Sequence, residues 1–176
     1  MNIQLVRLTD EYREQLFEML TEWKSDIMEN QTDMSPRAIW TNDFYDFENY
    51  VEKLEVREET ENGWVPDTTL FCLDQDRNIF VGAVNIRHYL NEGLLRTGGH
   101  IGDGVRPGER RKGYATAMLA LALKECKKLG IDRVLVCCDK DNVGSAKAIV
   151  KNGGVLENEV EEDGHVVQRY WIENKC

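Results

Sequence analysis

Hydrophobic residues recur at helical spacing in four segments of the chain. The first predicted helix follows a Thr9 cap and carries an apolar stripe made of Tyr12, Leu16, Met19 or Leu20, and Trp23. The other three helices are predicted at residues 44–54, 113–129 and 143–151, and Gly130 stands where a C-cap glycine belongs. The polar residues 30–41 between the first two helices are expected to form a loop or a short helix.

Seven shorter segments have the composition and spacing of strands: residues 3–6, 68–73, 79–89, 97–105, 133–138, 155–160 and 166–172. Polar turn sequences separate the second, third and fourth of them, which predicts an antiparallel meander. The last two flank Asp163-Gly164 and are predicted to form a closing hairpin. The fold class is therefore α+β. Because there is no internal repeat, low-complexity stretch or linker, we expect one domain over residues 1–176.

Composition narrows the compartment and the chemistry. No stretch approaches the roughly 20 apolar residues that cross a bilayer, and the first residues lack the pattern of a secretory signal, so we expect a cytoplasmic protein without a membrane partner. The five cysteines are odd in number and contain no CxxC pair, which argues against a disulfide framework or a zinc site. They are expected to be reduced thiols, and no metal is predicted.

The formal charge of −10 makes nucleic acid an improbable partner, because such binding depends on lysine and arginine neutralising phosphates. A cationic substrate suits this balance better, although acidic proteins are also common for reasons of solubility alone.

The segment from Gly104 to Ala115 departs from this acidic background. It lies between a predicted strand and the strongest predicted helix, so it places a helix N-terminus, with its unpaired N–H groups, at the end of a tight loop. Gly113 and Ala115 would let an anion approach the backbone closely. Arg110, Arg111 and Lys112 add positive charge at the same place. A ligand with a pyrophosphate group fits such a loop.

The spacing Arg110-x-x-Gly113-x-Ala115 resembles the Q/R-x-x-G-x-G/A signature of the GNAT N-acetyltransferases. The resemblance implies a central, mixed but mostly antiparallel sheet of six to seven strands with about four flanking helices. It also implies that acetyl-coenzyme A donates an acetyl group to the amine of a small molecule or peptide. The cofactor-binding residues that it implies are Val105, Arg110, Arg111, Lys112, Gly113, Tyr114, Ala115, Asn142 and Ser145. In the family, the loop cradles the pyrophosphate, and the strand that ends at Val105 and the Asn142 position contact pantetheine.

One position departs from the family pattern. Many relatives carry a tyrosine seven residues after the asparagine to protonate the departing thiolate, and here Ile149 stands there. A thiol of pKa about 8.5 that leaves at pH 7 is short by roughly 2 kcal/mol, a deficit that catalysis can survive. Ser145, a water molecule or Tyr114 are the alternative proton donors.

The acceptor amine needs a base, because an amine of pKa about 10.4 is neutral in only a few molecules per ten thousand at pH 7. Asp103 is the favoured candidate, followed by His100 and then by Glu92 and Asp139. Asp103 would equally suit a turn-capping role between two glycines, and His100 a strand position with hydrogen-bonded ring nitrogens.

Several alternatives stay open. Gly102-x-Gly104 resembles part of a dinucleotide-binding fingerprint, but Pro107 stands where the third glycine belongs. A catalytically silent module that binds or senses acyl-CoA would keep the fold and lose the reaction. The aromatic residues expected to shape an acceptor pocket are Trp23, Trp40, Phe44 and Tyr45. Cys137 and Cys138 are expected in the core and not as nucleophiles, and an exposed strand edge is where two copies would pair as a homodimer.

Overall fold

The computed structural model describes residues 1–174; Cys176, counted above among the reduced thiols, lies outside them. The strands are β1 (Ile3–Val6), β2 (Asp67–Asp74), β3 (Ile79–Arg87), β4 (Ile101–Val105), β5 (Arg133–Asp139), β6 (Val155–Glu162) and β7 (His165–Glu173). The α-helices are α1 (Arg13–Asn30), α2 (Phe47–Lys53), α3 (Tyr114–Lys128) and α4 (Val143–Lys151). Short 3-10 turns form η1 (Asp10–Tyr12), η2 (Arg37–Trp40) and η4 (Pro107–Glu109), and η3 (Leu94–Gly98) is a π turn.

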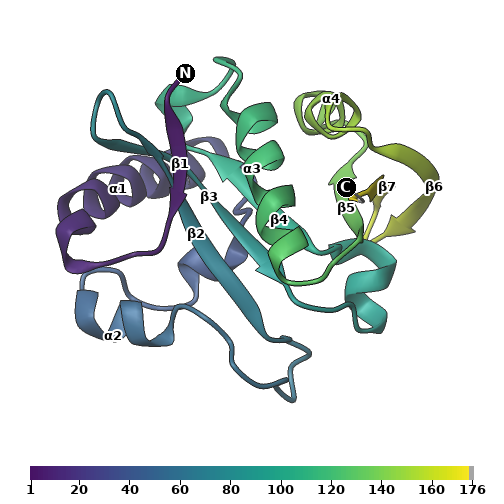
Figure 1. Cartoon of the computed structure of the whole chain (residues 1–176), viewed down its shortest axis with the longest axis horizontal. Coiled ribbons are helices and arrows are strands. Elements are labelled where there is room, and N and C mark those ends of the chain that lie inside the picture. The colour runs from purple at the N-terminus through teal and green to yellow at the C-terminus, as the bar shows by residue number, and fades with distance from the viewer. Residues whose placement is uncertain (175–176) are drawn as a thin grey trace.

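The seven strands form two sheets, in which every pairing is antiparallel. The order is β1-β2-β3-β4 in the first sheet and β5-β7-β6 in the second (Figure 1). The predicted meander and the hairpin at Asp163-Gly164 are both present, and both hairpin residues have positive φ, as a two-residue turn of this hand requires. The expected single sheet is instead split, because β4 and β5 do not pair along their length.

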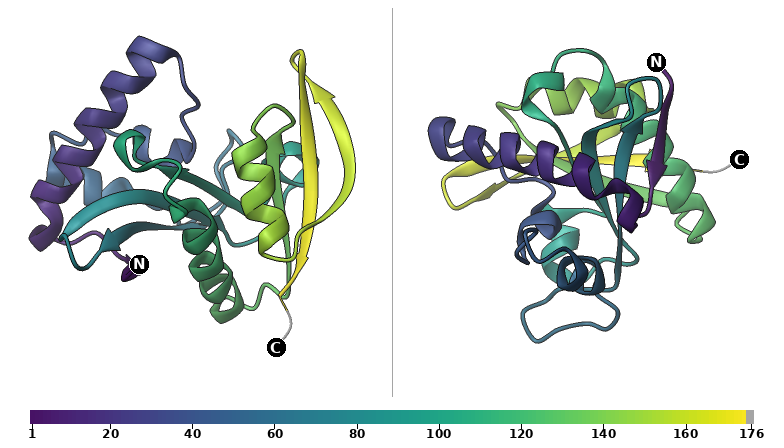
Figure 2. Two further views of the ribbon diagram at one scale, coloured as in Figure 1. Left: turned by 90° about the horizontal axis from the view of Figure 1, so that it is seen from above. Right: turned by 90° about the vertical axis from the view of Figure 1, so that its left-hand side faces the viewer.

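Two apolar clusters cover the two faces of the first sheet, one beneath α1 and one beneath α3; Figure 2 (left) shows these two helices on opposite faces. On one face, Leu16, Leu20 and Trp23 of α1 pack with Phe71 and Phe80. The cluster on the other face is built around α3 and also includes Val134, Val136 and Tyr170 of the second sheet. This cluster holds the two sheets together beneath the gap between β4 and β5. The full burial of one side chain of the size of leucine or phenylalanine contributes about 1.5–3 kcal/mol to the free energy of folding.

Three predicted boundaries are wrong, each for a local reason. Thr9 makes no side-chain cap, and a 3-10 turn precedes α1. Helix α2 begins only at Phe47, because the side chains of Asp43 and Asp46 accept backbone N–H groups and favour a turn before it. The strand expected from residue 97 begins at Ile101, after the π turn η3.

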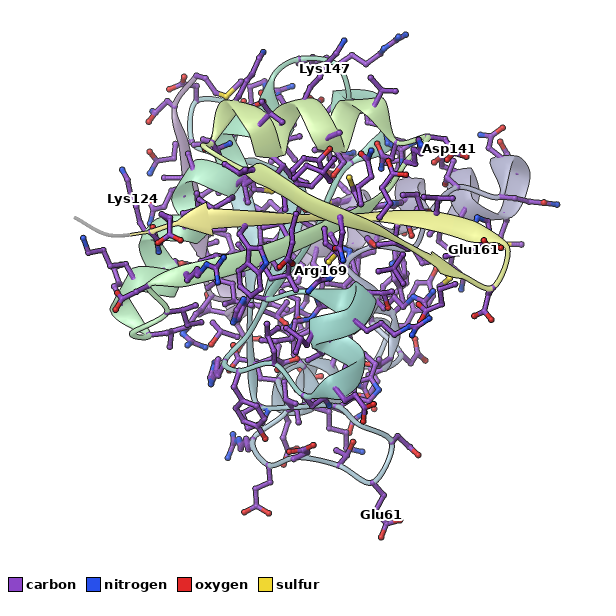
Figure 3. All side chains as sticks on the ribbon, turned by 90° about the vertical axis from the view of Figure 1, so that its right-hand side faces the viewer. Glu61, Lys124, Asp141, Lys147, Glu161 and Arg169 are labelled. Atoms are coloured by element: carbon purple, nitrogen blue, oxygen red, sulfur yellow. The ribbon has the colours of Figure 1, made fainter. Side chains whose placement is uncertain are left out.

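The π turn is fixed from both sides. Asn91 accepts the backbone N–H of Leu94 at 3.0 Å, and the guanidinium of Arg169 on β7 donates twice to the Leu95 carbonyl, at 2.8 and 3.1 Å (Figure 3). Gly99 then has φ of 70°, and a Cβ there would lie 2.7 Å from the Leu135 carbonyl of β5. The chain thus enters β4 in close contact with β5. No helix among residues 1–174 is long and apolar enough to span a membrane.

Candidate active site

The loop between β4 and α3 ends in an uncapped helix N-terminus. Gly113 is the N-cap residue and has φ of 88°, a conformation that glycine adopts without strain. No side chain caps the helix, so its first-turn N–H groups are available to an anion. A Cβ at residue 113 would meet only the Met1 methyl group within 4 Å, at 3.7 Å. Backbone geometry and open space therefore coincide at this glycine.

The basic side chains of the loop differ in how far they are already engaged. Arg110 donates to Asp26 of α1 at 2.9 Å and to the Val105 carbonyl at 3.3 Å. Lys112 forms an ion pair with Glu109 at 3.1 Å. Arg111 is exposed and forms no ion pair within residues 1–174. A phosphate would compete with carboxylates for two of these cations but not for Arg111.

The Tyr114 side chain points away from the loop and into a buried network. Its hydroxyl donates to Asp74 at 2.7 Å and accepts from Arg77 at 2.7 Å. Burial, followed by the bond to Asp74, raises the pKa of this hydroxyl. The backbone N–H groups of Tyr114 and of Ala115, the next residue on α3, can still face a ligand. The tyrosine hydroxyl cannot, because it donates to Asp74. This placement contradicts the suggestion that Tyr114 protonates the leaving thiolate.

A gap between β4 and β5 leaves one edge of each strand free. β4 pairs only with β3, and β5 pairs only with β7. The two sheets are joined at the start of β4 by His100, whose backbone N–H donates to the Leu135 carbonyl at 2.8 Å. The His100 Nδ1 also accepts the Leu135 N–H at 2.9 Å. From there toward Val105 the β4 edge is open to a ligand.

These bonds to His100 argue against its predicted role as a base. Nδ1 already accepts a backbone N–H, so in the neutral ring the proton resides on Nε2 and no lone pair remains free. Burial, assisted by the charge of Arg87, lowers the pKa of His100 to about 4. His100 therefore joins the two sheets as a neutral, hydrogen-bonded residue, the alternative that the sequence left open.

A cavity of about 620 Å³ lies at the mouth of the gap. Residues 101–103 of β4 and 137–139 of β5 form two of its walls, and segment 33–37 before and within η2 forms a third. Asn142 and Ser145 line it from the start of α4. The charged residues in its wall are Asp33, Asp103, Asp139, Asp141, Glu162, Arg37 and Arg87. Glu92, one of the candidate bases, does not line it.

Asp103 combines a position in this cavity with an altered proton affinity. The residue is half-buried on β4, and burial raises the pKa of its carboxyl to about 6. The negative charge of Asp33 adds to the rise, and Arg87 opposes it. A carboxylate with this pKa is mostly ionised at neutral pH and holds a proton more strongly than an ordinary aspartate, as a general base requires.

The model of the acetyltransferase (GNAT) domain matches residues 2–155. The chain belongs to the GNAT acetyltransferase family. It is accordingly an N-acetyltransferase with acetyl-CoA as acetyl donor, which confirms the predicted family, enzyme class and cofactor. The comparison with curated protein sequences gives no match.

Solved GNAT structures share the fold at low sequence identity. An acetyltransferase from Bacillus anthracis is 18% identical, with a TM-score of 0.63 and coverage of 99% of this chain and 96% of that one. The microcin C7 self-immunity acetyltransferase MccE, solved with acetyl-CoA and AMP, is 19% identical, with a TM-score of 0.66 and coverage of 97% and 91%. A spermidine N-acetyltransferase SpeG chimera from Vibrio cholerae and hSSAT is 14% identical, with a TM-score of 0.62 and coverage of 99% and 96%. The predicted fold class is confirmed.

The described residues fit acetyl-CoA. The uncapped start of α3 suits its pyrophosphate, and the free edge of β4 up to Val105 offers main-chain groups to an extended amide-containing arm. Asn142 caps α4 by accepting the Ser145 N–H at 3.1 Å, which leaves its side-chain N–H groups for a ligand in the cavity. Acetyl-CoA supplies an acetyl group activated as a thioester.

The position of the usual tyrosine is filled by core. Ile149 is 1% exposed and packs in the cluster around α3, so it supplies neither a hydroxyl nor a surface to the cavity. Ser145, one turn earlier on α4, lines the cavity, and its side chain opposes the rise in the pKa of the Cys138 thiol. Of the side chains proposed as proton donors, only Ser145 lies in the cavity.

The aromatic residues predicted to shape the pocket are placed elsewhere. Trp23 and Phe44 are buried in the α1 core, Trp40 packs edge-on against Trp23, and Tyr45 is 62% exposed. None of them lines either described cavity. Trp23 instead packs beneath β4, where a Cβ at Gly104 would lie 2.7 Å from its ring. The cavity of about 620 Å³ has several charged residues in its wall in their place.

Sequence reasoning missed the two arginines of the cavity. Arg87 ends an otherwise apolar strand, and Arg37 follows the Ser35-Pro36 pair in the polar segment. The position of Arg87 at the end of a buried strand could have indicated a cavity in the sequence, because a charge there needs an ion partner or access to solvent. Cys137 and Cys138 also line the cavity; burial raises the pKa of Cys137 to about 12 and that of Cys138 to about 11, so both are thiols at neutral pH.

Proposed function

We propose that the protein transfers the acetyl group of acetyl-CoA directly to a primary amine of a small molecule or peptide, with Asp103 as the general base. The observation that carries this proposal is that Asp103 of β4 lines the same cavity as Asn142 and Ser145. The pKa of about 6 suits Asp103 for accepting the proton of an amine as the amine attacks.

Each residue has one task in this proposal. The amides at residues 113–115, with Arg111, bind the pyrophosphate, and the β4 edge near Val105 aligns the donor with the cavity. The amine nitrogen forms a bond to the acetyl carbon, the carbon–sulfur bond breaks, and the amine proton passes to Asp103. The Ser145 hydroxyl donates its proton to the departing sulfur and takes a proton back from solvent water. The carboxylates around Asp103 favour an acceptor that arrives as a cation.

The deciding experiment is an acetylation screen with a panel of amines, run on the wild type and on Asp103→Asn, in which CoA thiol release and the mass of the product are measured. We expect one acceptor class to be acetylated, and Asp103→Asn to lose about 10²- to 10⁴-fold in kcat/KM. Acetyl-CoA affinity, measured by calorimetry, should be the same in both proteins. Equal rates in both proteins would remove Asp103 from the mechanism.

The rival hypothesis of a silent binding or sensing module is motivated by the buried Ile149. Tight binding of acetyl-CoA together with no transfer to any amine would support that rival. Ser145→Ala provides a second control, because a lost proton donor should lower kcat without altering acetyl-CoA affinity. The missing proton is worth at most roughly 2 kcal/mol for a thiol of ordinary pKa, which corresponds to about 30-fold in rate.

A further inference from the structure

Arg87 lines the cavity of about 620 Å³ in which we propose that the acceptor binds, and its guanidinium forms no ion pair with another described residue. Its Nη1 donates to the carbonyl oxygens of Gly98 and Gly99, at 3.2 and 3.4 Å. The guanidinium lies against Gly102, where a Cβ would be 3.0 Å from Nη2 and 3.2 Å from Nη1. Within residues 1–174, Arg87 forms no ion pair at 4 Å or less. Gly102 thus provides the space that lets this charge reach the cavity wall.

The surroundings of Arg87 leave its charge incompletely compensated. Burial lowers its pKa, and the positive charge of Arg37 acts in the same direction. Asp67 and Asp103 act in the opposite direction, but neither forms an ion pair with it. A buried charge without a partner is costly, and an anion that binds beside it recovers part of that cost.

Arg37 adds a second cation at the same place. It is exposed at the start of η2, lines the cavity of about 620 Å³, and also lines a neighbouring cavity of about 200 Å³. Arg87 lines the same two cavities. Like Arg87, Arg37 forms no ion pair within residues 1–174. Two guanidiniums at one junction repel each other unless an anion lies between them, and their planar forks match a carboxylate.

The wall of the cavity therefore contains both carboxylates and guanidiniums, which suit the two opposite charges of one small molecule. Asp103, Asp33, Asp139 and Asp141 suit an ammonium group, whereas the two arginines suit an anion. We infer that the acceptor is a zwitterionic amine, of the amino-acid or short-peptide class, whose carboxylate binds Arg37 and Arg87 while its amine faces Asp103. This inference rests on the proposed function and narrows it. A polycation such as a polyamine would place a positive charge against the two arginines.

The test uses acceptors with one carbon skeleton that differ in whether they carry the anion, and the rates are compared per unprotonated amine. For each of several amino acids, the acid, its primary amide and the amine that lacks the carboxylate are assayed with acetyl-CoA, with spermidine alongside. We expect the acid to exceed its amide and its amine by at least about tenfold in kcat/KM, the effect of one charge-assisted hydrogen bond of about 1.5–3 kcal/mol.

Variants then locate the anion site. Arg37→Gln, at an exposed position, should lower kcat/KM for the acid by about 10- to 100-fold and change that for the matched amine by less than about threefold. Arg87→Lys keeps the buried charge but removes the fork, so it should give the same selective loss if Arg87→Gln fails to fold. Arg57 is an exposed arginine that lines neither cavity. Arg57→Gln is therefore the matched control and should leave kcat/KM unchanged for both the acid and the amine.

Two results would overturn the inference: spermidine or another amine without an anion as the best acceptor, or equal losses for acid and amine in Arg37→Gln. If no amine is acetylated at all, the proposed function fails first. Calorimetry of the acid and the amide with the CoA-loaded protein then decides the anion site separately. Selective binding of the acid that Arg37→Gln abolishes would support the site, and the absence of binding would overturn it.

Discussion

The loop before α3, which we propose binds the cofactor, and the cavity of about 620 Å³, which we propose binds the acceptor, lie on either side of Val105 in the chain, yet they are built in opposite ways. The loop consists of consecutive residues, 106–113, followed by the first turn of α3, so its chemistry is set by local sequence. The cavity draws its wall from β4, β5, the segment at residues 33–37, the start of α4 and the ends of β3 and β6. A local motif can bind a constant ligand such as pyrophosphate, whereas a wall assembled from separate segments can change its specificity one residue at a time.

After the loss expected for Asp103→Asn, the largest expected effect tests the local half. Gly113→Ala should weaken CoA binding by roughly 10- to 100-fold, because a Cβ at the helix start separates phosphate oxygens from the amides and forfeits one or two charge-assisted hydrogen bonds. The new side chain meets no backbone atom within 4 Å, so a loss of affinity would reflect the lost approach and the strain at φ 88°. Calorimetry with CoA measures it.

The matched control is Gly164→Ala in the β6–β7 turn. Gly164 has φ of 80°, and a Cβ at this residue would meet nothing within 4 Å. The strain of about 1–2 kcal/mol in unfolding free energy should therefore equal that of Gly113→Ala. CoA affinity should be unchanged in this control. Similar CoA affinities for both variants would mean that the helix start does not hold the pyrophosphate.

The next effect tests the assembled half through pH. Asp103 must be ionised to accept a proton, and its pKa is raised to about 6, so its contribution is complete well above pH 6 and is lost as the pH falls through 6. The ratio of wild-type to Asp103→Asn kcat/KM should therefore fall by about tenfold from pH 7 to pH 5. Taking the ratio cancels the ionisation of the acceptor. A ratio that stays constant between pH 5 and 8 would exclude Asp103 as the titrating base.

The same division explains how much of the molecule could be predicted from sequence. The stripe of α3, the Gly113 turn and the Asp163-Gly164 hairpin each depend on neighbours in the chain, and all three were located from spacing. The separation of β4 from β5 depends on which strands fail to pair: the chain contacts β5 at Gly99 and His100, and beyond them β4 pairs with β3 and β5 pairs with β7. No local pattern specifies that contact, so a continuous sheet was expected.

The acceptor side was predicted in part. Asp103 was chosen from its place on the strand, and the structure puts it in the cavity, but its role as base stays a prediction. The aromatic residues chosen for the pocket belong to the core, because large apolar side chains on α1 are spaced to face the sheet. Arg37 and Arg87 are 50 positions apart in the chain and meet only through the fold. The single domain over residues 1–176 also stays a prediction.

A smaller effect tests how the two halves are joined. Glu22 of α1 accepts the Gly108 N–H at 2.7 Å and the Arg106 Nε at 2.6 Å, so it fixes the start of the cofactor loop. Glu22→Gln keeps one acceptor and loses the charge, and we expect CoA affinity to fall about three- to tenfold with KM for the acceptor unchanged. Glu48→Gln removes an exposed ion pair with Arg13 instead and should leave both constants unchanged. An acceptor KM that rises as much as the CoA dissociation constant would show that the halves are coupled through α1.

The smallest effect concerns Cys137, which lines the cavity beside the expected position of the thioester. A transfer through this cysteine would need its thiolate, but burial raises its pKa to about 12, so only about one molecule in 10⁵ is ionised at pH 7. His100, which directly precedes β4, has its Nδ1 occupied by the Leu135 N–H and cannot activate the thiol. Cys137→Ala should therefore change kcat/KM by less than about twofold, and the rate should depend on both substrates at once because the amine attacks the thioester itself. A loss of 100-fold, or an acetylated Cys137 peptide in mass spectra of acid-quenched protein, would contradict direct transfer. Either result would mean that the Cys137 sulfur, and not the acceptor amine, attacks the thioester first.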